Sequence, residues 1–145
     1  MIKRINYSLD RRTVCFEVLK KMDVKYSDEK INELLDIAEE NMMFAYYDGP
    51  QAVGFISLFS HNFYVLEISI AAVIKENQNK KIGTAILKEA YQYAKNNDYK
   101  ILETKIPATA DYIQARKFFE KKKFILLEEI AGKNIMVLPI FSEVL

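Results

Sequence analysis

Apolar residues recur along this chain with two different periods, one typical of helices and the other typical of strands. A spacing of three and four residues marks one face of a helix. It predicts a first helix carrying Val14, Cys15, Val18, Leu19 and Met22, a second carrying Ile31, Leu34, Leu35 and Ala38, and two more at 82–96 and 110–122. Ser27 is a suitable N-cap for the second helix, because Asp28 and Glu29 follow it in the first turn.

Shorter runs rich in β-branched and aromatic residues predict the strands. They lie at 2–6, 42–47, 51–60, 63–74, 100–106, 124–130 and 135–140. Asp48-Gly49 predicts a hairpin turn, Gly132 a second one, and Pro107 the end of a strand. The order β-α-α-β-β-β-α-β-α-β-β combines an antiparallel meander with a central β-α-β crossover. It predicts an α/β fold, a three-layer α/β/α sandwich with a mixed, mostly antiparallel sheet and a central parallel β-α-β pair.

The composition is that of an ordinary folded domain. With 145 residues, 50% of them hydrophobic and 28% charged, the chain is expected to form one domain over 1–145. The net charge of +1 gives no reason to expect nucleic acid or a membrane as a partner. A lone cysteine, Cys15, fits a reducing compartment, and no apolar run is long enough to act as a signal core or to span a bilayer. We therefore expect a cytoplasmic location.

The most informative stretch joins the predicted strand 63–74 to the predicted helix 82–96. Its polar turn, 78–84, ends where the helix begins. A helix N-terminus presents backbone N–H groups that have no helical partner, together with the positive end of the helix dipole, and so it binds anions such as phosphate. Lys80 and Lys81 add positive charge. The residues therefore predict a phosphate-binding turn, although the usual nucleotide-binding patterns Gly-x-x-x-x-Gly-Lys-Ser/Thr and Gly-x-Gly-x-x-Gly are both absent.

This turn resembles motif A of the GNAT acyltransferase superfamily, which reads Gln/Arg-x-x-Gly-x-Gly/Ala. The match here is Gln78-x-x-Lys81-x-Gly83, flanked by Val73 and by 84–87. The resemblance implies acetyl-CoA as co-substrate, its pyrophosphate held by the turn and its thioester by the preceding strand. The cofactor-binding residues it implies are Ala71, Ala72, Val73, Gln78, Asn79, Lys80, Lys81, Ile82, Gly83, Thr84 and Phe119. Lys81 replaces a glycine, so a left-handed backbone there would cost about 1–2 kcal/mol, partly offset if the lysine pairs with a phosphate.

A second resemblance lies at 111–124, which is similar to the family's motif B, Asn-x-x-Ala-x-x-Phe-Tyr-Glu-Lys-x-Gly-Phe. The matching residues are Ala115, Phe118, Glu120, Lys121 and Phe124. Three positions depart from the motif: Tyr112 replaces the asparagine, Phe119 the tyrosine and Lys123 the glycine. In the family that tyrosine is often the general acid that protonates the leaving thiolate, which Phe119 cannot do. Another group such as Tyr112, Tyr91 or Tyr64 serves instead, or water does, or the protein binds coenzyme A without turning it over.

The resemblance also implies a general base. Glu67 lies on the strand ahead of the turn, at a spacing where some members carry a glutamate that deprotonates the amine nucleophile. The alternative is an ordinary surface glutamate on the polar side of the strand, and Glu103 is a second candidate base. His61, the only histidine, is expected to be a solvated turn residue. No cluster of His, Cys, Asp or Glu has metal-ligand spacing, so no metal is expected.

Three functions remain open from the sequence. The first is an N-acetyltransferase in which a primary amine, on a small molecule or a peptide, attacks acetyl-CoA directly in a ternary complex. The second is a catalytically impaired relative that binds acyl-CoA as a sensor or interaction module, and the third is an unrelated phosphate-binding α/β domain. The residues that could line an acceptor pocket are Tyr46, Tyr47, Phe59, Phe63 and Tyr64. A homodimer could form if the apolar last strand, 135–145, pairs or exchanges with that of a second copy.

Overall fold

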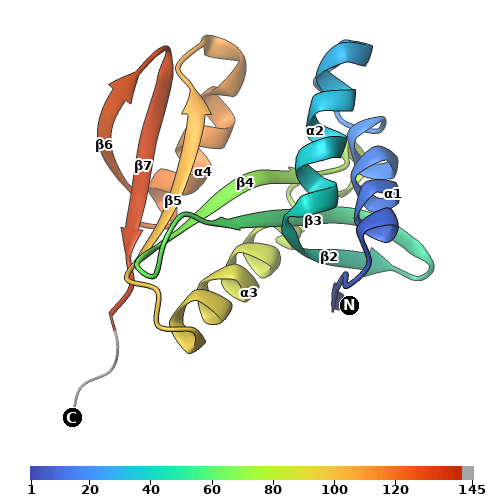
Figure 1. Cartoon of the computed structure of the whole chain (residues 1–145). Helices are drawn as coiled ribbons and strands as arrows, with labels where there is room; N and C mark the ends of the chain where they lie inside the picture. Colours follow the sequence, from blue (N-terminus) through green and yellow to red (C-terminus); the bar gives the residue numbers. More distant parts are fainter. Residues whose placement is uncertain (142–145) are drawn as a thin grey trace. The chain divides into compact units, whose positions relative to one another are not determined.

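The helices and strands form close to where their patterns place them (Figure 1). The computed structural model describes residues 1–141. In chain order its strands and helices are β1 Ile2–Arg4, α1 Ser8–Leu19, α2 Asp28–Glu40, β2 Met42–Asp48, β3 Gln51–Ser60, β4 Val65–Val73, α3 Ile82–Asn96, β5 Ile101–Pro107, α4 Ile113–Lys121, β6 Ile125–Ile130 and β7 Lys133–Pro139. Two short 3₁₀ helices, η1 Lys75–Asn77 and η2 Ala110–Tyr112, precede α3 and α4. The predicted order of elements is therefore confirmed.

The strands form one mixed sheet in the order β1-β2-β3-β4-β5-β7-β6. The pairs β1–β2, β2–β3, β5–β7 and β6–β7 are antiparallel, and β4–β5 is parallel. Helix α3 connects the two parallel strands. The predicted α/β fold, with a mostly antiparallel sheet and a parallel β-α-β pair, is thus confirmed.

Two compact units make up the described chain. Unit 1 comprises Met1–Phe59 and Ser69–Gln92, and unit 2 comprises Ser60–Ile68 and Tyr93–Leu145. The expectation of one acyltransferase domain over 1–145 remains a prediction. No helix of residues 1–141 is both long enough and apolar enough to cross a membrane.

Unit 1 buries its apolar side chains between helices and sheet. Figure 1 shows α1 and α2 on one face of β2 and β3, with α3 on the other. The predicted inner faces of the first two helices are buried, including Val14, Cys15, Val18, Leu35 and Ala38.

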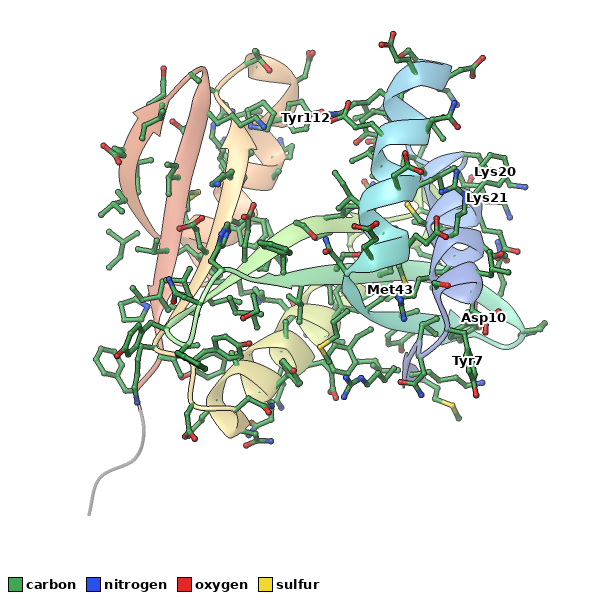
Figure 2. The ribbon with its side chains drawn as sticks, in the orientation of Figure 1. Tyr7, Asp10, Lys20, Lys21, Met43 and Tyr112 are labelled. Carbon is green, nitrogen blue, oxygen red and sulfur yellow. The ribbon has the colours of Figure 1, made fainter. Side chains whose placement is uncertain are left out.

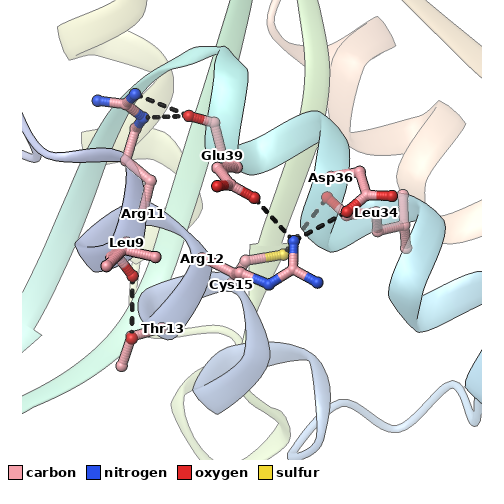
Figure 3. Close-up of polar contacts among 8 residues, drawn as sticks. All are labelled: Leu9, Arg11, Arg12, Thr13, Cys15, Leu34, Asp36 and Glu39. Atoms are coloured by element: carbon pink, nitrogen blue, oxygen red, sulfur yellow. Dashed lines mark hydrogen bonds and ion pairs between the residues drawn. The ribbon is translucent and has the colours of Figure 1, made fainter.

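Polar contacts join α1 to α2 (Figure 3). Arg11 donates to the carbonyl of Glu39 through Nε (3.1 Å) and Nη2 (2.7 Å), and Arg12 lies 2.8 Å from Asp36.

Unit 2 has its own aromatic core. Phe119 packs edge-to-face on Phe118 at 5.2 Å and on Phe124 at 5.0 Å between ring centroids. Arg116 ties α4 to the end of β5, because its Nη1 donates to the carbonyls of Pro107 (2.6 Å) and Thr109 (2.8 Å). Figure 2 shows Tyr112 at the start of α4.

Local hydrogen bonds explain the few boundaries that differ from prediction. Helix α1 ends at Leu19 and leaves Met22 outside, because Lys21 and Met22 donate three residues back, to Val18 (3.1 Å) and Leu19 (3.2 Å). Strand β7 begins at Lys133, two residues before the predicted start. Ala131 (φ 51°) and Gly132 (φ 77°) form a two-residue turn of left-handed residues, which lets the return strand begin at once.

Strand β7 also bears on the predicted dimer contact. It lies between β5 and β6 and pairs with both, from Lys133 to Pro139. Since both edges of this strand are already paired, it cannot add a strand from a second copy. The rest of the proposed contact, 142–145, lies outside the described residues.

Candidate functional site

The turn between β4 and α3 is fixed by hydrogen bonds within unit 1. The side chain of Gln78 donates through Nε2 to the carbonyl of Val73 (3.1 Å), the last residue of β4, and lies 3.4 Å from Asp23. The backbone N–H of Gln78 donates to the carbonyl of Lys75 (3.3 Å). These bonds fold the turn back on the end of the strand and fix where α3 begins.

Two residues of the turn have left-handed backbones, Asn79 (φ 65°) and Lys81 (φ 63°). Asparagine tolerates this conformation, whereas lysine has no compensating local hydrogen bond and incurs its cost. Lys81 is the residue that replaces the first glycine of the resembled motif. The backbone therefore has the conformation that a glycine would favour there, although the side chain is a lysine.

The same substitution occurs at the end of α4. Lys123, which replaces the glycine of the second motif, has φ 73°. Phe124 donates to the carbonyl of Phe119 (3.0 Å), five residues back, and Lys123 donates to Glu120 (3.0 Å). This is the Schellman pattern, in which a left-handed residue ends a helix. At both departures from glycine the backbone conformation is therefore kept.

The first turn of α3 presents amides that can bind an anion. The first backbone bond of the helix runs from the N–H of Ala85 to the carbonyl of Lys81 (3.1 Å). The amides of Ile82, Gly83 and Thr84 precede that bond, at the positive end of a helix of 15 residues. Lys80 and Lys81 are exposed beside them. Backbone donors and lysine charges therefore meet at one place, which suits a phosphate or pyrophosphate.

Strand β4 leads into this turn through small residues. Ala72 is buried and Ala71 is exposed, as alternation along a strand requires. The close packing of Gly54 under the strand leaves little room, since a Cβ there would lie 3.2 Å from the Ala72 carbonyl and 3.2 Å from Ile82 Cγ2. The ladder between β4 and β5 comprises the pairs from Val65–Ile101 to Ile68–Thr104. The predicted thioester contacts, Ala71–Val73, thus lie on the part of β4 that follows this ladder.

Three ionisable side chains, those of His61, Glu103 and Lys105, surround Glu67 in unit 2. His61 Nε2 lies 2.5 Å from Glu67 Oε1, and Lys105 Nζ lies 3.7 Å from the same oxygen. Glu103 is opposite Glu67 in the parallel register and lies 3.8 Å from Lys105 Nζ. The side chains of Glu67 and Glu103 are only 16% and 19% exposed. Glu67 is therefore a shielded, hydrogen-bonded carboxylate, unlike an ordinary surface glutamate.

His61 was expected to be a solvated turn residue; it is exposed at the hairpin, and its imidazole also contacts Glu67. Its hairpin folds it toward Glu67, because its backbone N–H donates to the carbonyl of Val65 (3.0 Å). The side chain of Asn62 accepts from the N–H groups of Tyr64 (2.7 Å) and Val65 (3.0 Å). Nothing in the sequence around His61 indicates this contact, which depends on how the hairpin turns.

No metal was expected because no cluster of His, Cys, Asp or Glu has metal-ligand spacing along the sequence, but the fold brings three such side chains together. One ligand atom each of His61, Glu67 and Glu103 lies within 4.8 Å of the others. The parallel register brings Glu103 beside Glu67, which spacing along the chain does not reveal. Lys105 already supplies a positive charge within 3.7–3.8 Å of both carboxylates. Lys105 therefore offsets one of the two carboxylate charges.

Phe119 lies in the core of unit 2, where it is 6% exposed. It lacks a hydroxyl and packs between two other phenylalanines.

Among the candidate replacements for the missing acid, Tyr64 is 62% exposed on the hairpin that follows β3. Tyr112 lies at the N-cap of α4.

The aromatic residues suggested for an acceptor pocket are divided between the units. In unit 1, Tyr46 and Tyr47 line an open hollow of about 570 Å³ with Met1, Lys3, Asp48, Gly49, Asn77, Lys80 and Ile82. Burial raises the pKa of the Tyr47 phenol, with Glu17 and Asp10 adding to the effect. In unit 2, Phe63 and Tyr64 are exposed on the hairpin. Each group could contact an acceptor by itself.

A central helix that begins at a turn with free amides and two adjacent lysines suits a ligand that carries phosphate. A model of the family described as "Acetyltransferase (GNAT) domain" matches residues 11–138. The chain therefore belongs to the GNAT acetyltransferase family. The third hypothesis, an unrelated phosphate-binding domain, is accordingly wrong.

Solved structures agree on the fold at low sequence identity. A GNAT-family protein from Desulfovibrio desulfuricans has a TM-score of 0.81 at 16% identity, covering 97% of this chain and 99% of that one. The PaiA N-acetyltransferase of Thermoplasma acidophilum, in complex with coenzyme A, has a TM-score of 0.77 at 17% identity, covering 96% and 99%. The ribosomal-protein-S18-alanine N-acetyltransferase of Escherichia coli has a TM-score of 0.77 at 15% identity, covering 99% and 96%. No curated protein matches the chain.

Proposed function

We propose that this protein is an N-acetyltransferase that transfers the acetyl group of acetyl-CoA to a primary amine on a small molecule or a peptide. The observation that carries the proposal is the left-handed backbone of Lys81 immediately before the unpaired first-turn amides of α3. Membership of the GNAT family supports acyl transfer. The coenzyme A bound to the related PaiA enzyme supports the choice of donor.

In this proposal unit 1 holds the donor. The amides and side chains of 78–84 bind the pyrophosphate, with Lys80 and Lys81 adding charge. The backbone of Ala71–Val73 binds the pantetheine arm and orients the thioester carbonyl. Phe119 belongs to the cofactor side only through its place in the resembled motif.

Glu67 acts as the general base. An ammonium ion has no lone pair, so the acceptor must lose a proton before it can attack. Glu67 takes that proton, directly or through a water molecule. The amine nitrogen then forms a bond to the thioester carbon, the carbon–sulfur bond breaks, and coenzyme A leaves as a thiolate that takes a proton from water or from a tyrosine. No covalent bond to the protein is formed.

A second candidate function is favoured by Phe119. Because this side chain has no hydroxyl and is buried among other rings, it cannot protonate the thiolate. A protein that binds acyl-CoA as a sensor, without turnover, would need no such acid. Thiols of ordinary pKa near ~8.5 leave fairly well without help, so we rank the enzyme first.

Calorimetric titration of acetyl-CoA into the purified protein tests the donor, with ATP and NAD as controls. Micromolar binding of acetyl-CoA alone is the expected result, and a screen of primary amines for thiol release would then test turnover. Binding of ATP instead, or of none of the three, would overturn the proposal.

Variants separate the two candidates. Gly83→Leu places a side chain among the first-turn amides and should abolish acetyl-CoA binding in both. Lys81→Ala should weaken binding, whereas Lys88→Ala, an exposed lysine further along α3, is the charge-matched control. Glu67→Gln should lower turnover without weakening binding only if the protein is an enzyme, and Glu76→Gln, an exposed glutamate of η1, is its control.

A further inference from the structure

The ionisable cluster of unit 2 contains one group that the proposed chemistry has not used, the imidazole of His61. It is the only histidine in the chain. Its Nε2 lies 2.5 Å from Glu67 Oε1, within hydrogen-bonding distance. Histidine is the side chain that most readily gains and loses a proton near neutral pH. We propose that His61 and Glu67 form a proton-relay pair, an inference that rests on the proposed acetyl transfer.

The exposure of the two side chains gives the relay a direction. The Glu67 side chain is 16% exposed, whereas that of His61 is 36% exposed. The Glu67 carboxylate is therefore shielded from solvent, whereas the His61 imidazole is in contact with solvent. A proton that arrives on Glu67 can leave through the ring to water, which restores the carboxylate for the next acceptor.

The two carboxylate oxygens of Glu67 have different roles in the relay. The contacts to His61 and to Lys105 are both made by Oε1. Oε2 takes part in neither, and it is the oxygen that the acceptor ammonium would approach. The ammonium gives its proton to the carboxylate and keeps the electron pair that attacks the thioester. The carboxylic acid turns to bring this proton to Nε2 of a ring that carries its own proton on Nδ1, and the imidazolium then releases the Nδ1 proton to water, which leaves the Nε2–H donating to the carboxylate.

The charged groups near His61 come from two neighbouring strands. Glu67 on β4 and Glu103 on β5 are carboxylates, and Lys105 on β5 is the one positive charge among them. When both carboxylates are ionised, the three groups together carry one net negative charge. With the ring protonated during the relay, the charges of the four groups sum to zero.

The hairpin holds the ring in place for this role. Asn62 accepts two backbone N–H bonds, and the Tyr99 hydroxyl donates to Ser60 Oγ at 2.8 Å. Ser60 Oγ in turn donates to the carbonyl of Asn62 (3.2 Å). These bonds fix both sides of the turn that carries His61. Because His61 acts on the acceptor only through Glu67, it is a positioning residue rather than a catalytic one.

Chemical rescue tests the relay. His61→Gly removes the ring and opens space for a small molecule from solvent, and we expect kcat with a working amine acceptor to fall about 100-fold. Added imidazole should restore a large part of the lost rate. His61→Gln keeps a hydrogen-bonding group beside Glu67 but cannot take up or release a proton near neutral pH, so it should be equally slow and should not respond to imidazole. Glu120→Gln, an exposed carboxylate on α4, should behave as the wild type.

Two further readouts exclude a merely structural role. The acidic limb of the pH profile of kcat should be present in the wild type and altered in both His61 variants, while the affinity for acetyl-CoA stays unchanged. Because there is one histidine, ¹⁵N NMR gives a single pair of ring signals. The Nε2 signal should move in Glu67→Gln and stay in place in Glu120→Gln.

The outcomes separate this inference from the proposed function. The relay would be overturned if His61→Gly kept the wild-type kcat, or if the Nε2 chemical shift of His61 were the same in Glu67→Gln as in the wild type. Either result would leave acetyl transfer intact. A wild-type protein that neither binds acetyl-CoA nor acylates any amine would overturn both, and the calorimetry would reveal that before any His61 variant is made.

Discussion

Replacing Lys81 by glycine should make this protein more stable, even though glycine usually destabilises folded chains. The backbone of Lys81 is left-handed, with φ 63°. In that conformation the Cβ of an L-residue crowds the following carbonyl oxygen, whereas glycine has no Cβ. The substitution should therefore remove strain from the turn without changing its shape.

The change in the free energy of unfolding on Lys81→Gly is the difference of two opposing contributions. Relief of the left-handed strain is worth about 1–2 kcal/mol, and the greater freedom of glycine in the unfolded chain costs about 0.5–1 kcal/mol. The net gain is about 0.5–1 kcal/mol. For a chain of 145 residues this corresponds to a rise in Tm of roughly 2–3 °C.

Urea unfolding followed by circular dichroism measures the free energy of unfolding, with Lys80→Gly as the matched control. Lys80 is the preceding residue, carries the same charge and is not left-handed. Its replacement by glycine incurs only the entropic cost, so we expect a loss of about 0.5–1 kcal/mol. If Lys81→Gly is destabilised as much as Lys80→Gly, the argument from backbone strain is refuted.

Three further predictions concern the core and the helix caps. Gly54→Val should cost about 1–3 kcal/mol in urea unfolding, because its Cβ would lie 3.2 Å from the carbonyl of Ala72, and a variant as stable as the wild type would contradict the close packing. Burial raises the pKa of the Cys15 thiol to about 12 from its ordinary 9.0, so stability should be fully present below pH 9 and fall as the pH rises from 9 towards 12. The same thiol should react with Ellman's reagent only on unfolding, and stoichiometric labelling of the native protein at pH 8 would refute its burial. Ser27→Ala should cost about 0.5–2 kcal/mol, since the hydroxyl accepts from the N–H of Lys30 at 3.1 Å, while Ser27→Asp should retain most of the stability.

Much of the fold was predictable because its signals are local. The apolar spacing of 82–96 marks α3 from end to end, and Asp48-Gly49 marks the turn between β2 and β3. Each of these signals lies within a few residues of the structure it specifies. The order of elements follows from them without any knowledge of long-range contacts.

The surroundings of Glu67 could not be predicted in the same way. A strand pattern reveals which face a residue occupies but not which residue of a neighbouring strand lies opposite. Glu103 and Lys105 come next to Glu67 through the parallel register, and His61 through the shape of a hairpin. The carboxylate itself was predicted from a family resemblance, whereas its partners required the structure.

Lys81 and Lys123 illustrate a different limit. Each of these lysines replaces a glycine of a resembled motif, which the sequence alone presents as a departure. Both nevertheless have left-handed backbones, with φ 63° and 73°. Backbone conformation there is set by the hydrogen bonds of the turn and of the helix end, which lysine tolerates at an energetic cost. In this chain the two positions therefore have dihedral angles that glycine favours although their side chains are lysines.

The same strained turns have a consequence for how this protein could evolve or be engineered. The described chain holds five non-glycine residues with positive φ, at Asn79, Lys81, Asp98, Lys123 and Ala131. Sites that are far apart and share no contacts contribute to stability almost additively. Glycine at Lys81, Lys123 and Ala131 would thus form a small set of compensating substitutions. A lineage that adapts its acceptor specificity through destabilising changes could recover tolerance to heat at Lys123 and Ala131 without touching the residues proposed to bind or react, whereas glycine at Lys81 would also remove a charge from the proposed donor site.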